Sequence, residues 1–100
     1  MPYPTDNLPP IHPGAFLRDE IAALGLSARR FAAHIGVPRN AVTEIMNGER
    51  AITAIMAIRL GRAFATTAEY WMNLQAIYEL KRARAELPPG VMEIESFASG

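Results

Sequence analysis

The fold is decided by one stretch of sequence, SARRFAAHIGVPRNAVTEIMNG, at residues 27–48. Its first half is typical of a short helix capped by Ser27 and ended by Gly36, and its second half of another short helix closed by the Asn47-Gly48 pair. Apolar residues recur on one face of each helix, at Phe31, Ala32, Ile35, Ala41, Val42 and Ile45. Two short helices joined by a tight turn that contains glycine have the spacing of a helix-turn-helix.

The polar face of the second short helix carries side chains that can read DNA bases. A helix-turn-helix inserts the N-terminal end of its second helix into the major groove, and here that end presents Arg39, Asn40, Thr43 and Glu44. These residue types bond guanine, adenine and cytosine edges or touch the thymine methyl group. Phosphate contacts are expected from Ser27, Arg29, Arg30 and Arg50. The alternative is an ordinary helical hairpin with a solvated polar face.

Three further helices are expected around this segment, which makes the chain an all-α protein of five helices. One begins at Gly14 and stops at Gly25, one is capped by Thr53, and one runs from about Thr67 to Ala85 after a Thr66-x-x-Glu69 capping box. The helix that begins at Gly14 and the helix capped by Thr53 are predicted from apolar residues at helical spacing. These are Phe16, Leu17, Ile21, Leu24, Ile55, Met56, Ile58, Leu60 and Phe64.

One helix-turn-helix domain is expected over residues 14–86, with a segment on either side of it. Residues 1–13 contain five prolines and should form a flexible, extended N-terminal arm. Residues 87–100 form a short C-terminal tail, for which a strand, a docked segment and disorder all stay open. Gly61, inside the fourth helix, predicts a close approach by a neighbouring helix.

The fifth helix, at about residues 67–85, is apolar over more than one face. A helix that packs against one core needs only a single apolar stripe, so part of this surface should meet a second copy of the chain or another protein. The residues expected at this dimer or partner interface are Tyr70, Trp71, Leu74, Ile77 and Tyr78. The alternative is that the additional aromatic side chains cover a broad flank of the core.

Composition excludes several classes of protein. The 100 residues are 50% apolar and carry no net charge, but residues 27–62 hold six arginines against two glutamates, a balance of +4 in favour of nucleic-acid binding. The chain has no cysteine, and its two histidines, His12 and His34, have no carboxylate at a ligand spacing, so we expect no metal site and no cofactor. His12 is instead expected to order the start of the first helix.

Other motifs that would indicate an enzyme or a membrane protein are missing from the sequence. There is no glycine-rich phosphate loop and no nucleophile elbow, so we expect no catalytic residues and no enzymatic activity. No apolar run reaches the roughly 18 residues that span a bilayer, and the first residues have no secretory-signal pattern. We therefore expect a cytoplasmic protein that does not bind membranes.

Three stretches of the chain resemble the HigA-type antitoxins, which belong to the Xre-type, lambda-repressor-like helix-turn-helix family. They are IHPGAFLRDEI at 11–21, GLSARRFAAHIGVPRNAVTEIMNGERAIT at 25–53 and AIRLGRAFATTAEYWMNLQAIYELKRAR at 57–84. The resemblance implies a five-helix, lambda-repressor-like domain that forms a homodimer and binds operator DNA. It further implies repression of the protein's own operon and neutralisation of a RelE-like ribonuclease toxin.

Two positions depart from the family pattern. Ala28 stands where a glutamine often opens the second helix, and Glu49 stands where the family usually has lysine. Each departure removes a phosphate partner, so we expect modest DNA affinity. Two other functions share this sequence pattern: a stand-alone phage-type repressor, and a module that sequesters a partner protein without binding DNA.

Overall fold

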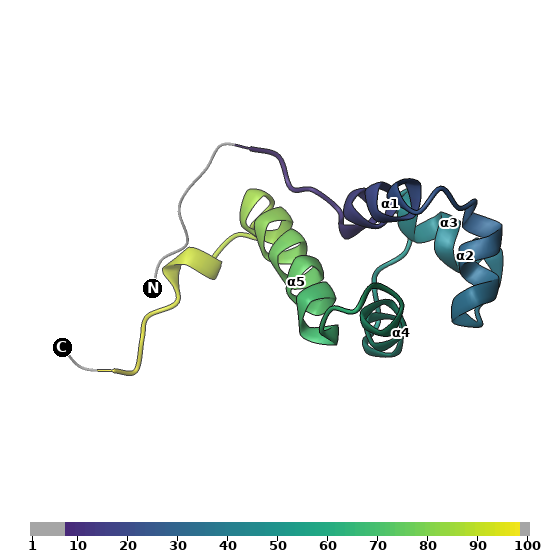
Figure 1. Cartoon of the computed structure of the whole chain (residues 1–100). Helices are drawn as coiled ribbons and strands as arrows, with labels where there is room; N and C mark the ends of the chain where they lie inside the picture. The colour runs from purple at the N-terminus through teal and green to yellow at the C-terminus, as the bar shows by residue number, and fades with distance from the viewer. Residues whose placement is uncertain (1–7, 99–100) are drawn as a thin grey trace.

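The computed structural model describes residues 8–98. Within that range all of the regular secondary structure is helical, with no strand. The helices are α1 (Pro13–Ala23), α2 (Ala28–Ile35), α3 (Arg39–Met46), α4 (Ala54–Phe64) and α5 (Ala68–Ala85), followed by a 3₁₀ turn at Val91–Glu93. Figure 1 shows α2 and α3 at one end of the molecule and α5 with the tail at the other. The predicted all-α fold is confirmed. None of these helices is long and apolar enough to cross a membrane.

The expected N-terminal arm falls partly outside the described residues, at 1–7. Residues 8–12 have no regular structure, and α1 begins one residue earlier than expected, at Pro13. Proline at the first helical position fits because its missing N–H would have no partner inside the helix. Among the described residues the tail forms no strand, and its Met92, Ile94 and Phe97 side chains are exposed rather than docked on the helices.

Side-chain hydroxyls cap the N-termini of three of the helices. Ser27 accepts a hydrogen bond from the Arg30 N–H at 3.2 Å, and Thr53 accepts one from the Met56 N–H at 3.3 Å, as the sequence predicts. The predicted capping box at Thr66 is wrong by one residue, because α5 is capped by Thr67. Thr66 instead accepts a hydrogen bond at 3.1 Å from the indole N–H of Trp71, a buried donor that needs a partner.

The core lies where the inner faces of α1 to α5 meet. All six predicted inward positions of α2 and α3 are buried. By contrast, Phe16 of α1, Leu24 just after it, and Ile55 and Ile58 of α4 are exposed, Ile55 by 67%. Each of these helices turns only one stripe toward the core, so its remaining apolar side chains are left outside. The buried core residues are Leu17, Ile21, Phe31, Ala32, Ile35, Ala41, Val42, Ile45, Ile52, Met56, Ala57, Leu60 and Trp71.

Trp71 corrects the expected interface on α5. Its side chain is only 1% exposed and packs in the core next to Phe64, with ring centroids 5.7 Å apart, so it is not available to a partner. Leu74 and Tyr78 are half-buried, whereas Tyr70 and Ile77 are exposed. The wide apolar pattern of α5 therefore contains one core-facing stripe and a second stripe that no described residue covers.

Two glycines allow close contacts between helices. A Cβ atom at Gly14 of α1 would overlap the backbone carbonyl of Ile45 in α3. A Cβ atom at Gly61 of α4 would lie 3.0 Å from the Thr66 carbonyl oxygen and 3.1 Å from the Ala68 nitrogen. The close approach predicted for a neighbouring helix is thus made by the turn into α5 and by the first residue of that helix. Beside the first contact, the Arg18 guanidinium donates to the Met46 carbonyl at 2.9 Å. This bond satisfies one of the carbonyls left unpaired at the end of α3.

Gln75 ties α5 to the loop between α3 and α4. Its side chain is only 4% exposed, and its carbonyl oxygen accepts a hydrogen bond from the Ile52 backbone N–H at 2.9 Å. The buried N–H of Ile52 thereby gains the partner it needs. We predicted no role for Gln75 from the sequence, although a polar residue on the core-facing stripe of a helix is a signal for such a bond.

We expect Gly14→Ala to destabilise the protein by about 2 kcal/mol or more, because the added methyl group forces α1 away from the backbone of α3. Urea denaturation measures the change. Ala15→Ser, at the exposed neighbouring position, is the control and should change stability little. Equal stability of Gly14→Ala and the wild type would contradict the close α1–α3 contact.

We expect Gln75→Leu to cost about 1–3 kcal/mol, because it leaves the buried N–H of Ile52 without a hydrogen bond. Hydrogen exchange should show faster exchange at Ile52 than in the wild type. Asn73→Leu, on the exposed side of α5, introduces the same side chain and should not change that rate. Unchanged protection of Ile52 in Gln75→Leu would show that the bond does not hold the loop.

Candidate nucleic-acid interface

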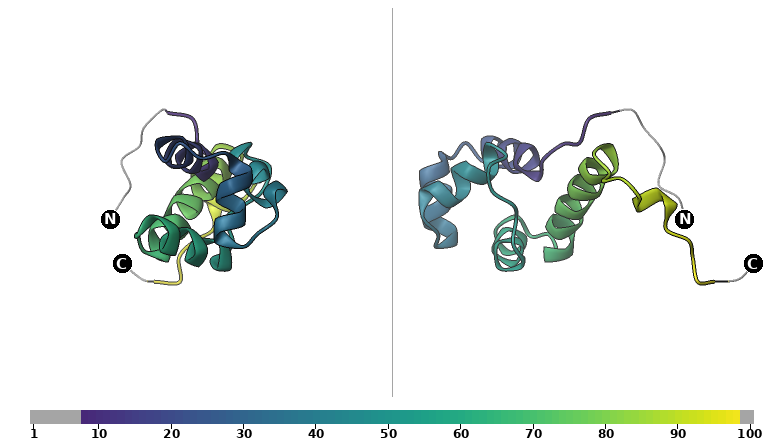
Figure 2. Two further views of the ribbon diagram at one scale, coloured as in Figure 1. Left: turned by 45° about the vertical axis from the view of Figure 1, so that its right-hand side comes forward. Right: turned by 180° about the vertical axis from the view of Figure 1, so that it is seen from behind.

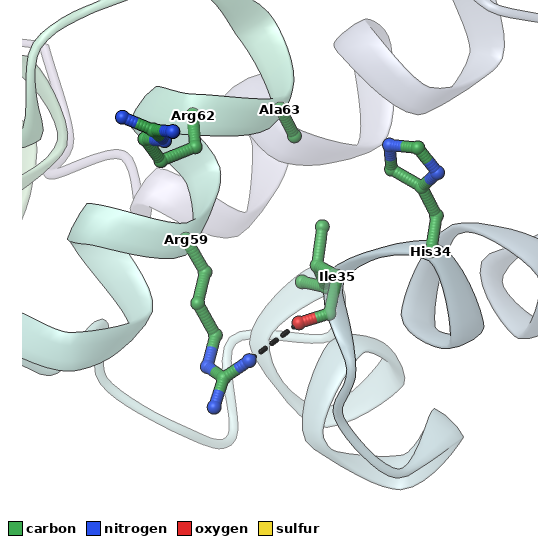
Figure 3. Close-up of a pocket in the computed structure, with 5 residues that line it drawn as sticks. All are labelled: His34, Ile35, Arg59, Arg62 and Ala63. Atoms are coloured by element: carbon green, nitrogen blue, oxygen red, sulfur yellow. Dashed lines mark hydrogen bonds between the residues drawn. The ribbon is translucent and has the colours of Figure 1, made fainter.

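A tight turn joins α2 to α3. Gly36 adopts a left-handed conformation, with φ 77° and ψ 36°, and the Val37 N–H then donates to the Ala32 carbonyl at 3.0 Å. The Arg59 side chain, on α4, donates to the Ile35 carbonyl at the end of α2 (Figure 3). These contacts hold the tight turn, since left-handed backbone favours glycine and the last carbonyls of a helix need partners.

The N-terminal end of α3 has no side-chain cap. Pro38 occupies the N-cap position and makes no side-chain hydrogen bond, as the sequence predicts. The first backbone N–H groups of α3 thus have no capping acceptor, and the helix dipole adds partial positive charge at the same end. A helix terminus of this kind favours a phosphate group or another anion.

The predicted base-reading side chains lie together on the outer side of α3. Arg39 and Asn40 are exposed, whereas Thr43 and Glu44 are half-buried. The Thr43 hydroxyl donates to the Asn40 carbonyl at 3.3 Å, and the Asn40 amide donates to the Glu44 carboxylate at 3.3 Å. The surface of α3 is therefore internally hydrogen-bonded rather than a set of independent side chains.

Glu44 also binds Arg50, a residue for which we predicted a phosphate contact. The Arg50 Nη2 and Nε atoms lie 2.9 and 3.1 Å from the same carboxylate oxygen of Glu44. The hydrogen bond and charge of Arg50 lower the pKa of Glu44 below its ordinary value, so this carboxylate stays ionised at neutral pH. We predicted both residues at the interface from the sequence, but not that they pair with each other.

The remaining predicted phosphate residues lie at the start of α2. Ser27, Arg29 and Arg30 are exposed there, and the Ser27 hydroxyl already accepts the capping hydrogen bond from the Arg30 N–H. Ala28, next to them, is half-buried and packs against the core. The structure thus leaves Arg29 and Arg30 as exposed cations near the start of α2.

A basic pocket lies between α2 and α4, with a volume of about 230 Å³. Its lining is His34, Ile35, Arg59, Arg62 and Ala63. Figure 3 shows the Arg59 guanidinium directed at the Ile35 carbonyl and the Arg62 guanidinium directed away from it. The two cations do not converge on one point. Within residues 8–98, no three metal-ligating side chains lie together either.

His12 joins the start of α1 to the loop that carries Arg50. Its Nδ1 atom accepts a hydrogen bond from the Gly14 N–H at 2.9 Å, which confirms that His12 orders the start of this helix. The ring lies edge-on to Tyr78 of α5, with centroids 4.9 Å apart, and within about 4 Å of where a Cβ at Gly48 would stand. Figure 2 shows this region, where α1, α5 and the α3–α4 loop approach one another.

The pKa of His12 lies below its ordinary value of 6.5. Burial of the ring is the largest cause, and the charge of Arg82 acts in the same direction. A hydrogen bond with the backbone of Arg50 and the charge of Glu79 oppose these effects. The neutral ring is also the form in which Nδ1 can accept the bond from Gly14.

The residues that form this surface lie in a part of the chain that is similar to known proteins. The model of a family described as helix-turn-helix matches residues 17–71. The virulence-associated protein I of Dichelobacter nodosus is 39% identical over 87 residues, which span 86% of this chain and 81% of that protein.

Two similar solved structures from Pseudomonas aeruginosa contain DNA. PA4674 in complex with its operator DNA has a TM-score of 0.83 and 42% identity, covering 91% of this chain and 100% of that one. The antitoxin HigA with the higBA promoter has a TM-score of 0.79 and 42% identity, covering 89% of this chain and 99% of that one.

We expect the stability that His12 contributes to be complete above pH 6.5 and to be lost as the pH falls through the lower pKa of the folded state. Stability falls with acid because, between these two pKa values, the folded protein binds fewer protons at His12 than the unfolded chain does. Comparing urea denaturation from pH 7.5 to 5 for the wild type and His12→Asn measures this contribution. Asparagine keeps a capping oxygen but does not titrate, so this variant should lose less stability on acidification.

His12→Ala removes both the cap and the titration, and it should be less stable than the wild type by about 1 kcal/mol at pH 7.5. A His12→Asn variant that loses stability with acid as steeply as the wild type would contradict the assignment of this dependence to His12.

Proposed function

The chain belongs to the helix-turn-helix family, and from that premise we propose that it is a DNA-binding antitoxin of the HigA type. As a homodimer it binds operator DNA through α3, represses its own operon and neutralises a RelE-like ribonuclease toxin. The observation that carries the proposal is the exposed polar end of α3. It lies in a chain whose sequence is 42% identical to that of a protein solved with its operator DNA. The activity belongs to one domain at residues 14–86, flanked by an arm (1–13) and a tail (87–100).

Base reading is assigned to the N-terminal half of α3. Arg39 and Asn40 are exposed at the end of the helix that a helix-turn-helix inserts into the major groove, and Thr43 follows on the same side. Arginine bonds guanine O6 and N7 with two N–H groups, and asparagine bonds adenine N6 and N7 through its amide. Burial of the opposite face of α3 supports this assignment, because it fixes the rotation of the helix about its axis.

Phosphate contacts are assigned to Ser27, Arg29, Arg30 and Arg50, together with the uncapped N–H groups of α3. Arginines in these positions displace counterions from the phosphate backbone, which is the main source of sequence-independent affinity. The excess of positive charge in residues 27–62 supports the assignment, although the chain as a whole is neutral. The pair with Glu44 engages one of these arginines, Arg50, within the protein, in keeping with modest affinity.

Contacts with a second copy or with the toxin are assigned to the uncovered stripe of α5. Tyr70 and Ile77 are exposed there, and Leu74 and Tyr78 are half-buried beside them. Exposed apolar side chains that share one side of a helix commonly mark a protein–protein contact. A dimer formed through α5 presents two copies of α3, as a duplex with two half-sites requires.

We expect the purified protein to bind duplex from its own upstream region in preference to a scrambled duplex of equal length, with two half-sites about one helical turn apart. Arg39→Ala and Asn40→Ala should each weaken operator binding by about 1–3 kcal/mol, because each removes the hydrogen bonds to one base. Fluorescence anisotropy across a salt series measures both. Arg62→Ala, a cation outside the assigned contacts, is the matched control and should bind like the wild type.

Absence of sequence preference at every salt concentration would remove the DNA-binding proposal and favour a module that only sequesters a partner. The toxin claim has its own test, in which the protein is mixed with the product of the adjoining gene. Complex formation and loss of that protein's RNA cleavage are expected. Cleavage that persists in the presence of excess antitoxin would leave a stand-alone repressor as the better description.

A further inference from the structure

Three side chains form a hydrogen-bonded chain across the outer surface of α3. The Arg50 guanidinium gives two hydrogen bonds, at 2.9 and 3.1 Å, to one oxygen of the Glu44 carboxylate. The other oxygen of Glu44 accepts a bond from the Asn40 amide nitrogen at 3.3 Å. Both oxygens of Glu44 are therefore engaged by groups of the protein itself, which leaves this residue poorly suited to read a base directly.

We propose that Glu44 is a positioning residue that determines specificity: it holds the Asn40 amide and withholds the charge of Arg50 from DNA of arbitrary sequence. This inference rests on the proposed function. It revises the direct base-reading role predicted for Glu44, and it confines the phosphate contact assigned to Arg50 to complexes in which the pair with Glu44 opens. The inference concerns the ratio of the affinity for operator DNA to the affinity for other DNA, rather than the affinity for the operator alone.

The bond to Glu44 gives the Asn40 amide a direction. An asparagine amide has two N–H donors and one carbonyl oxygen. One N–H is engaged by Glu44, so one N–H and the carbonyl oxygen remain, which are the two groups that bond N7 and N6 of adenine. Without Glu44, the amide rotates and offers its donor and acceptor in either order. The bond therefore favours one base at the position that Asn40 faces.

The pair with Arg50 cancels a charge that any DNA would attract. A free arginine near the phosphates releases a counterion whatever the base sequence, and so adds affinity without discrimination. Arg50 and Glu44 are 44% and 38% exposed, so the pair lies at the surface where a phosphate would approach. While the pair is closed, Arg50 contributes little to non-specific binding, and the Glu44 carboxylate repels phosphates.

The backbone holds Arg50 where Glu44 can reach it. Arg50 follows the turn that ends α3, in which the Glu49 N–H donates to the Glu44 carbonyl at 2.8 Å and Gly48 is left-handed with φ 76°. The His12 ring lies within about 4 Å of where a Cβ at Gly48 would stand. Glu49 lies one residue before Arg50, but Glu44 is the partner in the one ion pair found among residues 8–98.

The decisive experiment compares Glu44→Ala with Glu49→Ala, which removes the same charge from the neighbouring turn and leaves the pair intact. Binding to operator and scrambled duplexes is measured across a salt series. Glu44→Ala should bind scrambled duplex several-fold more tightly than the wild type, and its slope of log K against log salt should steepen by about one unit. Its ratio of operator to scrambled affinity should fall by about threefold or more. Glu49→Ala should keep the wild-type ratio.

Glu44→Ala combined with Arg50→Ala identifies the source of the added affinity. If a freed Arg50 is responsible, the double variant returns to the wild-type salt slope. The Nε–H signal of Arg50 in an NMR spectrum provides a readout without DNA. It should exchange slowly with water in the wild type and in Glu49→Ala, and rapidly in Glu44→Ala.

Each contrary result has a defined meaning. Equal effects of Glu44→Ala and Glu49→Ala on the ratio of operator to scrambled affinity would show that loss of any negative charge near α3 is sufficient. That result would overturn the inference. A wild type that prefers operator, together with a Glu44→Ala variant that retains the full preference, overturns the inference alone. A wild type with no preference overturns the proposed function, and this inference with it.

Discussion

The contact between the backbones of α1 and α3 is the constraint on which the rest of the structure depends. No side chain other than hydrogen fits at Gly14, where α1 meets the carbonyl of Ile45. Around this point, Arg18 binds the Met46 carbonyl at the end of α3 and His12 caps α1. The inner face of α3 is buried as a consequence, and its polar face has one orientation relative to solvent. A helix that reads bases needs that orientation, because a rotation about its axis would replace one set of side chains with another.

The loop after α3 connects the two functional surfaces of the molecule. Gln75 of α5 contacts it through the Ile52 N–H, and Tyr78 of α5 packs edge-on against the ring of His12, which lies beside Gly48 of this loop. Arg50, which faces α3, lies in the same loop. The helix assigned to partner contacts and the helix assigned to DNA contacts are thus held by hydrogen bonds and ring packing to one short segment of backbone. A buried hydrogen bond such as that of Gln75 makes this connection stiff, since breaking it exposes an unpaired N–H.

Electrostatics explains how a chain without net charge can carry a DNA-binding surface. Affinity depends on cations near phosphates rather than on the total charge, and the arginines at the start of α2 and of α3 stand apart from the acidic tail. Arg59 and Arg50 show that arginines in the basic segment differ in role. The first binds the carbonyl end of α2, and the second binds Glu44. Counting arginines along the sequence therefore overstates by two the number whose guanidinium groups are not already engaged within the protein.

The sequence by itself determined the features that depend on neighbours along the chain. Ser27 as a cap, Gly36 as a helix end and the buried faces of α2 and α3 were all predicted, because capping and helical periodicity involve residues within one or two turns. Tertiary structure decided the rest. Thr66 serves the Trp71 indole instead of capping α5, and Trp71 fills the core instead of an interface. The Gln75–Ile52 bond joins residues 23 apart in the sequence. This bond and the burial of Trp71 depend on how the helices are placed in space, which no local pattern of residues encodes. The Thr66–Trp71 and Glu44–Arg50 bonds join residues only five and six apart, but they depend on the geometry of the turns before α5 and after α3, which capping and periodicity rules do not predict.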